Sequence, residues 1–172
     1  PIKSFPFPVD TNKFTPGTGE RKNVLIYFKK RGPEKERIVY EKLNSMNETC
    51  KMFRYGFYEE EEYLKYLKTC KYGIWLGTHE SQGFGLEEVL SCNVPLLVWN
   101  AQNMKDQWGW DTAPDMPATT VSYWDERCGE FFNERNEFDS TYDKFIKNLN
   151  NYKPREFVID TVGIEKCSQR FK

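Results

Sequence analysis

The chain has 172 residues, with 25 lysines and arginines against 26 aspartates and glutamates, and a formal net charge of −1. This length fits one domain, and the near-balance of charge argues against a nucleic-acid partner, which normally leaves a basic excess. No apolar run approaches the ~20 residues that cross a bilayer, so no membrane span is expected. Five cysteines without a C-x-x-C pair, and one histidine, exclude a Cys-rich zinc site and favour reduced thiols in a cytoplasmic protein.

The chain opens on a proline-rich segment, residues 1–22, which has no sustained periodicity and is expected to be an interdomain strap or linker. From residue 23 onward, short apolar runs alternate with segments of helical spacing, and we expect one domain over residues 23–172. Five runs are predicted to be strands, at 23–28, 50–55, 72–76, 95–100 and 119–123. Helices are predicted from Pro33 onward and at 59–70, 86–92, 139–149 and 154–171.

Strands that alternate with helices at this rhythm predict βαβ units. The predicted strands are continuously apolar rather than alternating, as expected when helices cover both faces of a sheet. The predicted fold class is therefore α/β, a single Rossmann-like open parallel sheet of about five to six strands with helices on both faces. The connection from Ala101 to Pro117 is long for such a unit, and loops of this length are usually functional or mobile.

The loop after the third predicted strand, GTHESQGFGLEE at residues 77–88, has the composition of an anion site. Ligands of open parallel sheets bind beyond the carboxyl ends of the strands, and the N–H groups of a helix start attract anions. Gly83 and Gly85 let a phosphate approach the backbone, and the flanking Glu80 and Glu88 can accept hydrogen bonds from vicinal hydroxyls. The loop therefore predicts a nucleotide-sugar site. The alternative is that these acids only favour a helix N-terminus.

A basic loop, KKRGPEK at residues 29–35, follows the first predicted strand at the same carboxyl edge. Arginine offers a bidentate fork to phosphate and lysine a point charge, so this loop is expected to neutralise a diphosphate. A solvated basic turn is the alternative. His79, next to Glu80, is either a donor to the ligand or a loop histidine bonded to a backbone carbonyl.

The segment ESQGFGLEEVLSCNVPLLVW, residues 80–99, closely resembles the donor-site motif of GT-B glycosyltransferases, the E-x7-E pattern of their large retaining group. Residues 8–14, 23–35 and 53–77 resemble the interdomain strap, the first strand and the elements before the motif in the C-terminal domain of that family. Asn93 stands where the family usually has glycine, and asparagine tolerates the left-handed conformation. The resemblance implies the C-terminal, donor-binding half of a GT-B fold.

The resemblance also implies roles for single residues. Glu80 is expected to contact the donor sugar as the catalytic residue, and Glu88 to bind the ribose hydroxyls, although Glu87 beside it leaves open which acid does so. The amides around the glycines are expected to hold the phosphates, with two basic side chains on the diphosphate. The expected binding residues are Arg31, Lys35, His79, Ser81, Gly83, Phe84, Gly85 and Glu88.

The implied function is that of a retaining glycosyltransferase domain that transfers a hexose-type sugar from a UDP- or GDP-sugar to a glycan or other acceptor. No metal or further cofactor is expected, because basic side chains supply the positive charge. An N-terminal acceptor domain of the same protein is expected to be missing, so the chain alone should be incomplete for transfer. The last helix should then be partly exposed at Phe157, Val158, Val162, Ile164 and Phe171. The alternatives are a non-catalytic nucleotide-sugar-binding module and a GT-B-fold epimerase-like protein.

Overall fold

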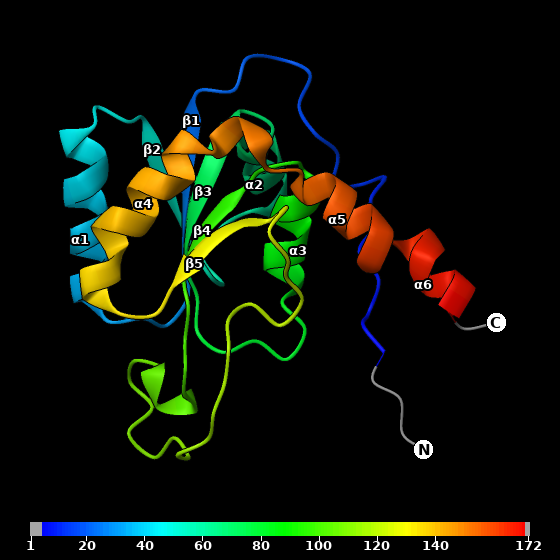
Figure 1. The fold of residues 1–172 in the computed structure, drawn as a ribbon. Helices are drawn as coiled ribbons and strands as arrows, with labels where there is room; N and C mark the ends of the chain where they lie inside the picture. Colours follow the sequence, from blue (N-terminus) through cyan, green and yellow to red (C-terminus); the bar gives the residue numbers. More distant parts are fainter. Residues whose placement is uncertain (1–4, 171–172) are drawn as a thin grey trace.

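Five short strands lie side by side in the order β2-β1-β3-β4-β5, and every pairing is parallel (Figure 1). The computed structural model describes residues 5–170. The strands are β1 (Asn23–Phe28), β2 (Cys50–Arg54), β3 (Cys70–Leu76), β4 (Leu96–Trp99) and β5 (Gly129–Phe132). The sheet is open, and the predicted α/β class with one Rossmann-like parallel sheet is confirmed.

Helices cover both faces of the sheet, as the apolar strands predicted (Figure 1). One face is covered by α1 (Pro33–Ser45) and α4 (Phe138–Lys147). The other face is covered by α2 (Glu60–Leu67), α3 (Phe84–Ser91) and α5 (Pro154–Thr161), and α6 (Ile164–Arg170) follows α5. Short 3₁₀ turns lie at Met104–Asp106, Arg135–Glu137 and Leu149–Asn151. No helix of residues 5–170 is both long and apolar enough to cross a membrane.

Two hydrophobic cores result from the alternation of side chains along the strands. Leu25 and Trp75 point into the core beneath α2, α3 and α5, whereas Ile26 and Ile74 point into the core beneath α1 and α4. All four side chains are buried. The central strands therefore contribute apolar area to both layers, which stabilises the sheet that carries the loops of the carboxyl edge.

The fifth strand lies further along the chain than predicted. Residues 119–123 form no strand; Thr119 instead accepts a backbone hydrogen bond from Glu80, and the Ser122 hydroxyl donates to the Glu80 carbonyl. The strand beside β4 begins at Gly129, whose φ of +135° and close approach to the Leu96 carbonyl leave no room for a side chain. Residues 119–123 thus hold the Glu80 loop through hydrogen bonds instead of pairing with the sheet.

The predicted last helix is divided at Gly163 into α5 and α6. Val9 pairs there with the chain, its N–H donating to the Val162 carbonyl at 2.8 Å. The expectation of exposed apolar positions is wrong for three of them, because α5 packs against α3 and the N-terminal segment and buries Phe157, Val158 and Val162. Ile164 is exposed, at 42 %, as expected, and Phe171 lies outside the described residues.

The described part of the predicted strap, residues 5–22, contains no helix or strand but is fixed to the domain. Val9 and Phe14 are buried in the core of α3 and α5, and the Ser91 hydroxyl donates to the Phe14 carbonyl at 2.7 Å. Arg155 of α5 donates to the carbonyls of Phe14, Thr11 and Ser91. Residues 5–22 therefore pack against this domain through α3 and α5.

The sequence prediction for the cysteines and for Asn93 agrees with the structure. All five cysteines are free thiols, four of them buried and Cys50 half-buried. Asn93 has a φ of +58°, so it takes the left-handed conformation between α3 and β4 that its side chain tolerates.

Candidate functional site

A cavity of about 200 Å³ lies where the carboxyl ends of β1, β2 and β3 meet the start of α3. Its walls are the side chains that end these strands and the glycine-rich loop before α3. The lining residues are Tyr27, Lys29, Tyr55, Trp75 and residues 80–85. The structure therefore brings Glu80, Ser81, Gly83, Phe84 and Gly85 together, as the sequence predicted.

An ion pair spans this cavity. The Lys29 ammonium lies 2.7 Å from a Glu80 carboxylate oxygen and 4.8 Å from the centre of the Tyr55 ring, and both charged side chains are largely shielded from solvent. The backbone of Glu80 is held by Thr119 and Ser122. A lysine so placed can turn to an incoming anion, and a carboxylate so placed can accept bonds from hydroxyl groups.

The start of α3 opens into the same cavity. Gly83 caps the helix with a φ of +89°, a left-handed conformation that glycine adopts without strain, and no side chain of the described residues caps the first turn. Gly85 lies over the stacked rings of Tyr27 and Trp75, whose centroids are 3.8 Å apart. The uncapped N–H groups and the helix dipole make this end of the cavity attractive to an anion.

The two adjacent acids of α3 lie in different surroundings. Glu87 is buried, and its carboxylate accepts hydrogen bonds from the Gln82 amide at 2.8 and 3.1 Å. Glu88 is half-buried on the side of α3 that faces Lys13, Glu60 and Tyr58. Burial raises the pKa of each carboxyl to about 7. Because Glu87 is enclosed, Glu88 is the acid that a ligand can reach, although it does not line the 200 Å³ cavity.

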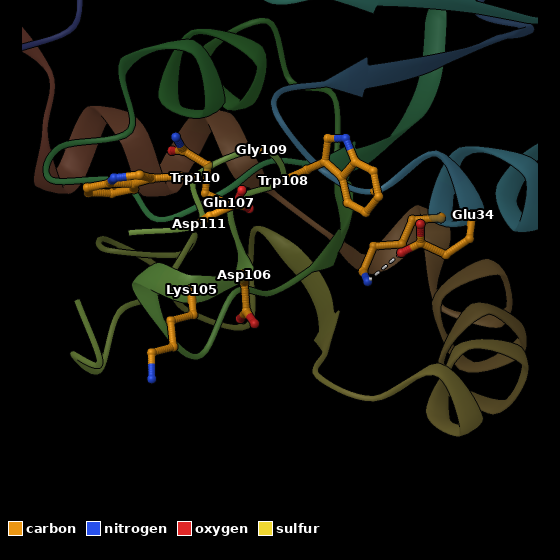
Figure 2. A pocket seen from close by; sticks show the side chains of 10 residues that line it. Glu34, Lys105, Asp106, Gln107, Trp108, Gly109, Trp110 and Asp111 are labelled. Atoms are coloured by element: carbon orange, nitrogen blue, oxygen red, sulfur yellow. Dashed lines mark hydrogen bonds and ion pairs between the residues drawn. The ribbon is translucent and has the colours of Figure 1, made fainter. Parts of the chain in front are cut away.

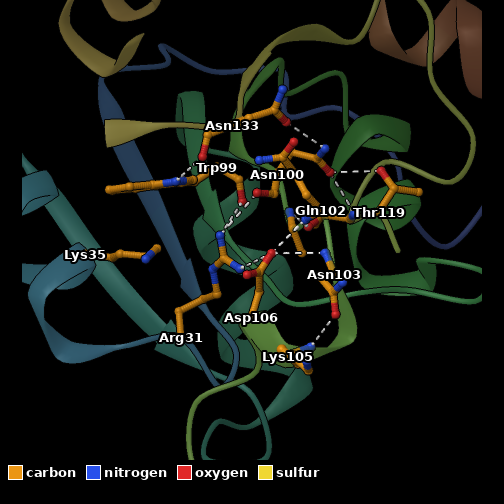
Figure 3. Close-up of polar contacts among 12 residues, drawn as sticks. Arg31, Lys35, Trp99, Asn100, Gln102, Asn103, Lys105, Asp106, Thr119 and Asn133 are labelled. Atoms are coloured by element: carbon orange, nitrogen blue, oxygen red, sulfur yellow. Dashed lines mark hydrogen bonds and ion pairs between the residues drawn. The ribbon is translucent and has the colours of Figure 1, made fainter. Parts of the chain in front are cut away.

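Arg31 and Lys35 do not line this cavity and lie instead near Trp99 and Asn100 (Figure 3). The Arg31 side chain is almost fully buried, and its Nη2 donates to the carbonyls of Trp99 and Asn100 at 3.4 and 3.2 Å. The Lys35 ammonium lies over the Trp99 ring, 4.8 Å from its centre. Both residues line a separate cavity of about 190 Å³ on the α1 and α4 side of the sheet. Their role on a diphosphate stays a prediction.

Arg31 is held with part of its hydrogen-bonding capacity unused. Its Nη1 lies 3.9 Å from Asp106, too far for a hydrogen bond, and neither Nε nor Nη1 has a partner among residues 5–170. Burial lowers the pKa of the Arg31 guanidinium, and the nearby Asp106 carboxylate opposes that effect. The side chain thus anchors the residues after β4 to the loop after β1.

His79 and Phe84 occupy the borders of the glycine-rich loop. The His79 ring packs against Trp110, with centroids 6.1 Å apart, and its buried Nδ1 has no hydrogen-bond partner in the described chain. His79 does not line the 200 Å³ cavity. Phe84 does, and its ring lies 5.9 Å from that of Phe7. The backbone-carbonyl partner considered for His79 is therefore absent at Nδ1.

No protein-family model and no curated protein matches this chain. Among solved structures, it is similar to the crystal structure of TarM, with 14% identity over 91% of this chain and a TM-score of 0.49. The chain spans 36% of the TarM chain, about a third. It is also similar to the C-terminal domain of a glycosyl transferase group 1 family protein (LpcC) from Francisella tularensis, at 12% identity. That likeness covers 95% of this chain and 98% of that domain, with a TM-score of 0.48. At these TM-scores neither likeness supports a step toward the function, which rests on the residues of this chain.

Sequence reasoning identified the loops of the cavity but not every side chain in it. Tyr27 and Trp75 were not expected in the site. Lys29 was expected there only as a member of the basic loop 29–35, and Tyr55 was not among the expected binding residues. Lys29 directly follows β1, and Tyr55 directly follows β2, so both stand at the carboxyl edge where ligands of parallel sheets bind. That position alone was the signal that could have found them.

Proposed function

We propose that the cavity before α3 binds the diphosphate and sugar of a nucleotide sugar, and that the chain is the donor-binding domain of a retaining glycosyltransferase. One observation supports this most directly. The uncapped start of α3, Lys29 and Glu80 all face a single cavity at the carboxyl edge of the sheet. An anion site beside a hydroxyl acceptor fits a ligand that carries both phosphates and a sugar.

Each side chain has a role in this proposal. The amides of Gly83 to Gly85 hold the diphosphate, and Lys29 neutralises it by turning from Glu80. Glu80 then accepts hydrogen bonds from the hexose hydroxyls. We assign the neutralising role to Lys29 in place of Arg31, because Lys29 lines the cavity and Arg31 is buried elsewhere. The proposal requires no metal, because Lys29 and the positive end of the α3 helix dipole supply the charge that the diphosphate needs.

The ribose would extend from the diphosphate along α3 toward Glu88. The half-buried carboxylate lies beside Tyr58, in the loop after β2. The donor would be a UDP- or GDP-sugar and the acceptor a glycan. A second domain would complete the transfer site, since the two halves of a GT-B fold share it.

The test is a calorimetric titration of the purified chain with UDP, GDP, ADP and their sugar conjugates, with and without a chelator. We expect millimolar or tighter binding of at least one member, unchanged by the chelator. Glu88→Gln should weaken that binding about tenfold, because losing a charged hydrogen-bond partner typically costs ~1.5–3 kcal/mol.

Glu87→Gln is the matched control, because the two acids are neighbours and only Glu88 is accessible. It should leave nucleotide affinity unchanged. Since burial raises the pKa of Glu88 to about 7, wild-type affinity should fall as the pH is lowered through 7, and Glu88→Gln should reduce that dependence. A folded sample that binds no member of the panel, or equal losses at both positions, would contradict the proposal.

A further inference from the structure

The long connection between β4 and β5 is held by a backbone bridge, hydrogen bonds and an ion pair. Asn103 and Pro117 form an isolated bridge, and Lys105 pairs with Asp115 at 2.8 Å. The Asp106 carboxylate accepts hydrogen bonds from the backbone N–H groups of Gln102 and Asn103. We call residues 101–118 the excursion; it projects from the carboxyl edge of the sheet (Figure 1).

The excursion is also joined to the two loops of the candidate site. The Trp108 backbone N–H donates to the Lys30 carbonyl at 2.9 Å, and the Trp110 ring packs against His79. Lys30 follows Lys29, and His79 precedes Glu80, so each anchor is one residue away from the ion pair of the 200 Å³ cavity. The excursion is therefore held beside the proposed donor site.

A second and larger cavity, of about 390 Å³, lies between the excursion and the start of α1 (Figure 2). Its volume is within the ~300–1,000 Å³ of small-molecule sites. Two tryptophans, Trp108 and Trp110, line it together with Glu34, Gln107 and Asp111. Trp108 is 63 % exposed although its backbone N–H is hydrogen-bonded to Lys30. An indole ring exposed at the wall of a cavity offers a ligand an apolar face on which to stack.

The charges of this cavity favour an uncharged ligand. Three acids line it, Glu34, Asp106 and Asp111, against the two lysines Lys35 and Lys105. Both lysines form ion pairs, Lys35 with Glu34 at 3.2 Å and Lys105 with Asp115 at 2.8 Å. A phosphate or nucleotide would meet an excess of carboxylates, whereas a neutral polyol would find acceptors and amide donors around an aromatic face.

We propose that this cavity binds a neutral pyranose ring of the acceptor glycan, stacked on Trp108 and hydrogen-bonded through Glu34, Gln107 and Asp111. As an acceptor site the proposal rests on the proposed function, because it names the substrate class that the donor cavity serves. The aliphatic face of the ring packs on the indole, and the carboxylates and amide accept and donate hydrogen bonds at the hydroxyls. The contact between the His79 and Trp110 rings then places the acceptor next to the donor.

The experiment is saturation-transfer difference NMR of the full chain with methyl glycosides of glucose, galactose, mannose and N-acetylglucosamine. Sorbitol, which has the hydroxyls without the ring, is the negative control ligand. We expect saturable, millimolar binding of at least one glycoside and none of sorbitol. Trp108→Ala should weaken the binding about tenfold, whereas Trp108→Phe should retain most of it, because the phenyl ring still stacks.

Met116→Ala is the matched protein control, since Met116 is an exposed apolar residue of the same excursion outside the cavity lining. It should bind glycosides as the wild type does. The proposal is overturned if no glycoside binds saturably, if sorbitol binds equally, or if Trp108→Ala and Met116→Ala behave alike in folded samples. Nucleotide titration of Trp108→Ala separates the two sites: retained nucleotide binding with lost glycoside binding supports an independent acceptor cavity. Glycoside binding without any nucleotide binding would overturn the proposed function and the acceptor assignment.

Discussion

At position 87 a carboxyl group lies inside the protein with one amide, that of Gln82, as its partner. Burial raises the pKa of Glu87 from its usual 4.5 to about 7. Between these two values the folded protein holds a proton that the unfolded chain has already released. This carboxyl therefore lowers the free energy of unfolding progressively as the pH rises from 4.5 to 7.

Replacing this acid by its amide should remove that penalty. At about pH 8, the free energy of unfolding of Glu87→Gln should exceed that of the wild type by on the order of 2 kcal/mol. Near pH 4.5 the two free energies should differ little. The measurement is urea unfolding at several pH values. Glu126→Gln, at an exposed acid, is the control and should show no such pH-dependent gain. A gain that is the same at every pH would mean that titration of Glu87 is not its cause.

At the scale of elements, the two glycines at the start of α3 should respond differently to alanine. Gly83 has a φ of +89°, which costs an L-residue ~1–2 kcal/mol, so Gly83→Ala should lower stability by about that amount. At Gly85 a Cβ would lie 3.4 Å from Trp75, an ordinary contact, and alanine favours a helix. Gly85→Ala should therefore fold normally but weaken nucleotide binding, because its methyl group enters the cavity.

Thermal unfolding and nucleotide titration of the same two variants test this difference. If Gly85→Ala bound nucleotides as tightly as the wild type, the phosphates would not approach the backbone at that position. If Gly83→Ala were as stable as the wild type, the left-handed cap of α3 would be wrong.

The strands of the sheet interior could be predicted because burial on both faces requires continuous apolar runs, and 23–28 is matched residue for residue. The edge strand β5 could not, because its sequence GEFF places Glu130 among the apolar residues. The cavity before α3 was predicted by glycines, which mark close backbone approach. The course of the basic loop could not be predicted from the sequence. Lys30 takes a φ of +50°, which few lysines adopt, and the chain after it turns the Arg31 side chain into the interior.

At the scale of the whole molecule, one side chain connects three separate parts of the chain. Arg155 of α5 donates to the Phe14 and Thr11 carbonyls of the N-terminal segment and to the Ser91 carbonyl at the end of α3. Arg155→Ala leaves these acceptors without that donor and should lower the free energy of unfolding by about 2 kcal/mol or more. Urea unfolding measures the loss.

The exposed Arg37→Ala is the control and should change stability by less than ~0.5 kcal/mol. Limited proteolysis should cut Arg155→Ala within residues 5–22 sooner than it cuts either Arg37→Ala or the wild type. Similar stability of the two variants would show that the N-terminal segment is held mainly by Val9 and Phe14.

The alkylation rate of each free cysteine reports how often the structure around it opens. Burial raises the pKa of Cys92 to about 11 and the pKa values of Cys70 and Cys128 to about 12, so these thiols are neither accessible nor ionised in the folded state. An alkylating reagent attacks only thiolates, so each residue reacts at the rate at which its surroundings open. In pulsed labelling with mass spectrometry, Cys50 should react first. Cys92, at the end of α3, should be slowed selectively by a bound nucleotide, whereas equal slowing at every cysteine would place the ligand's effect on the whole domain rather than on α3.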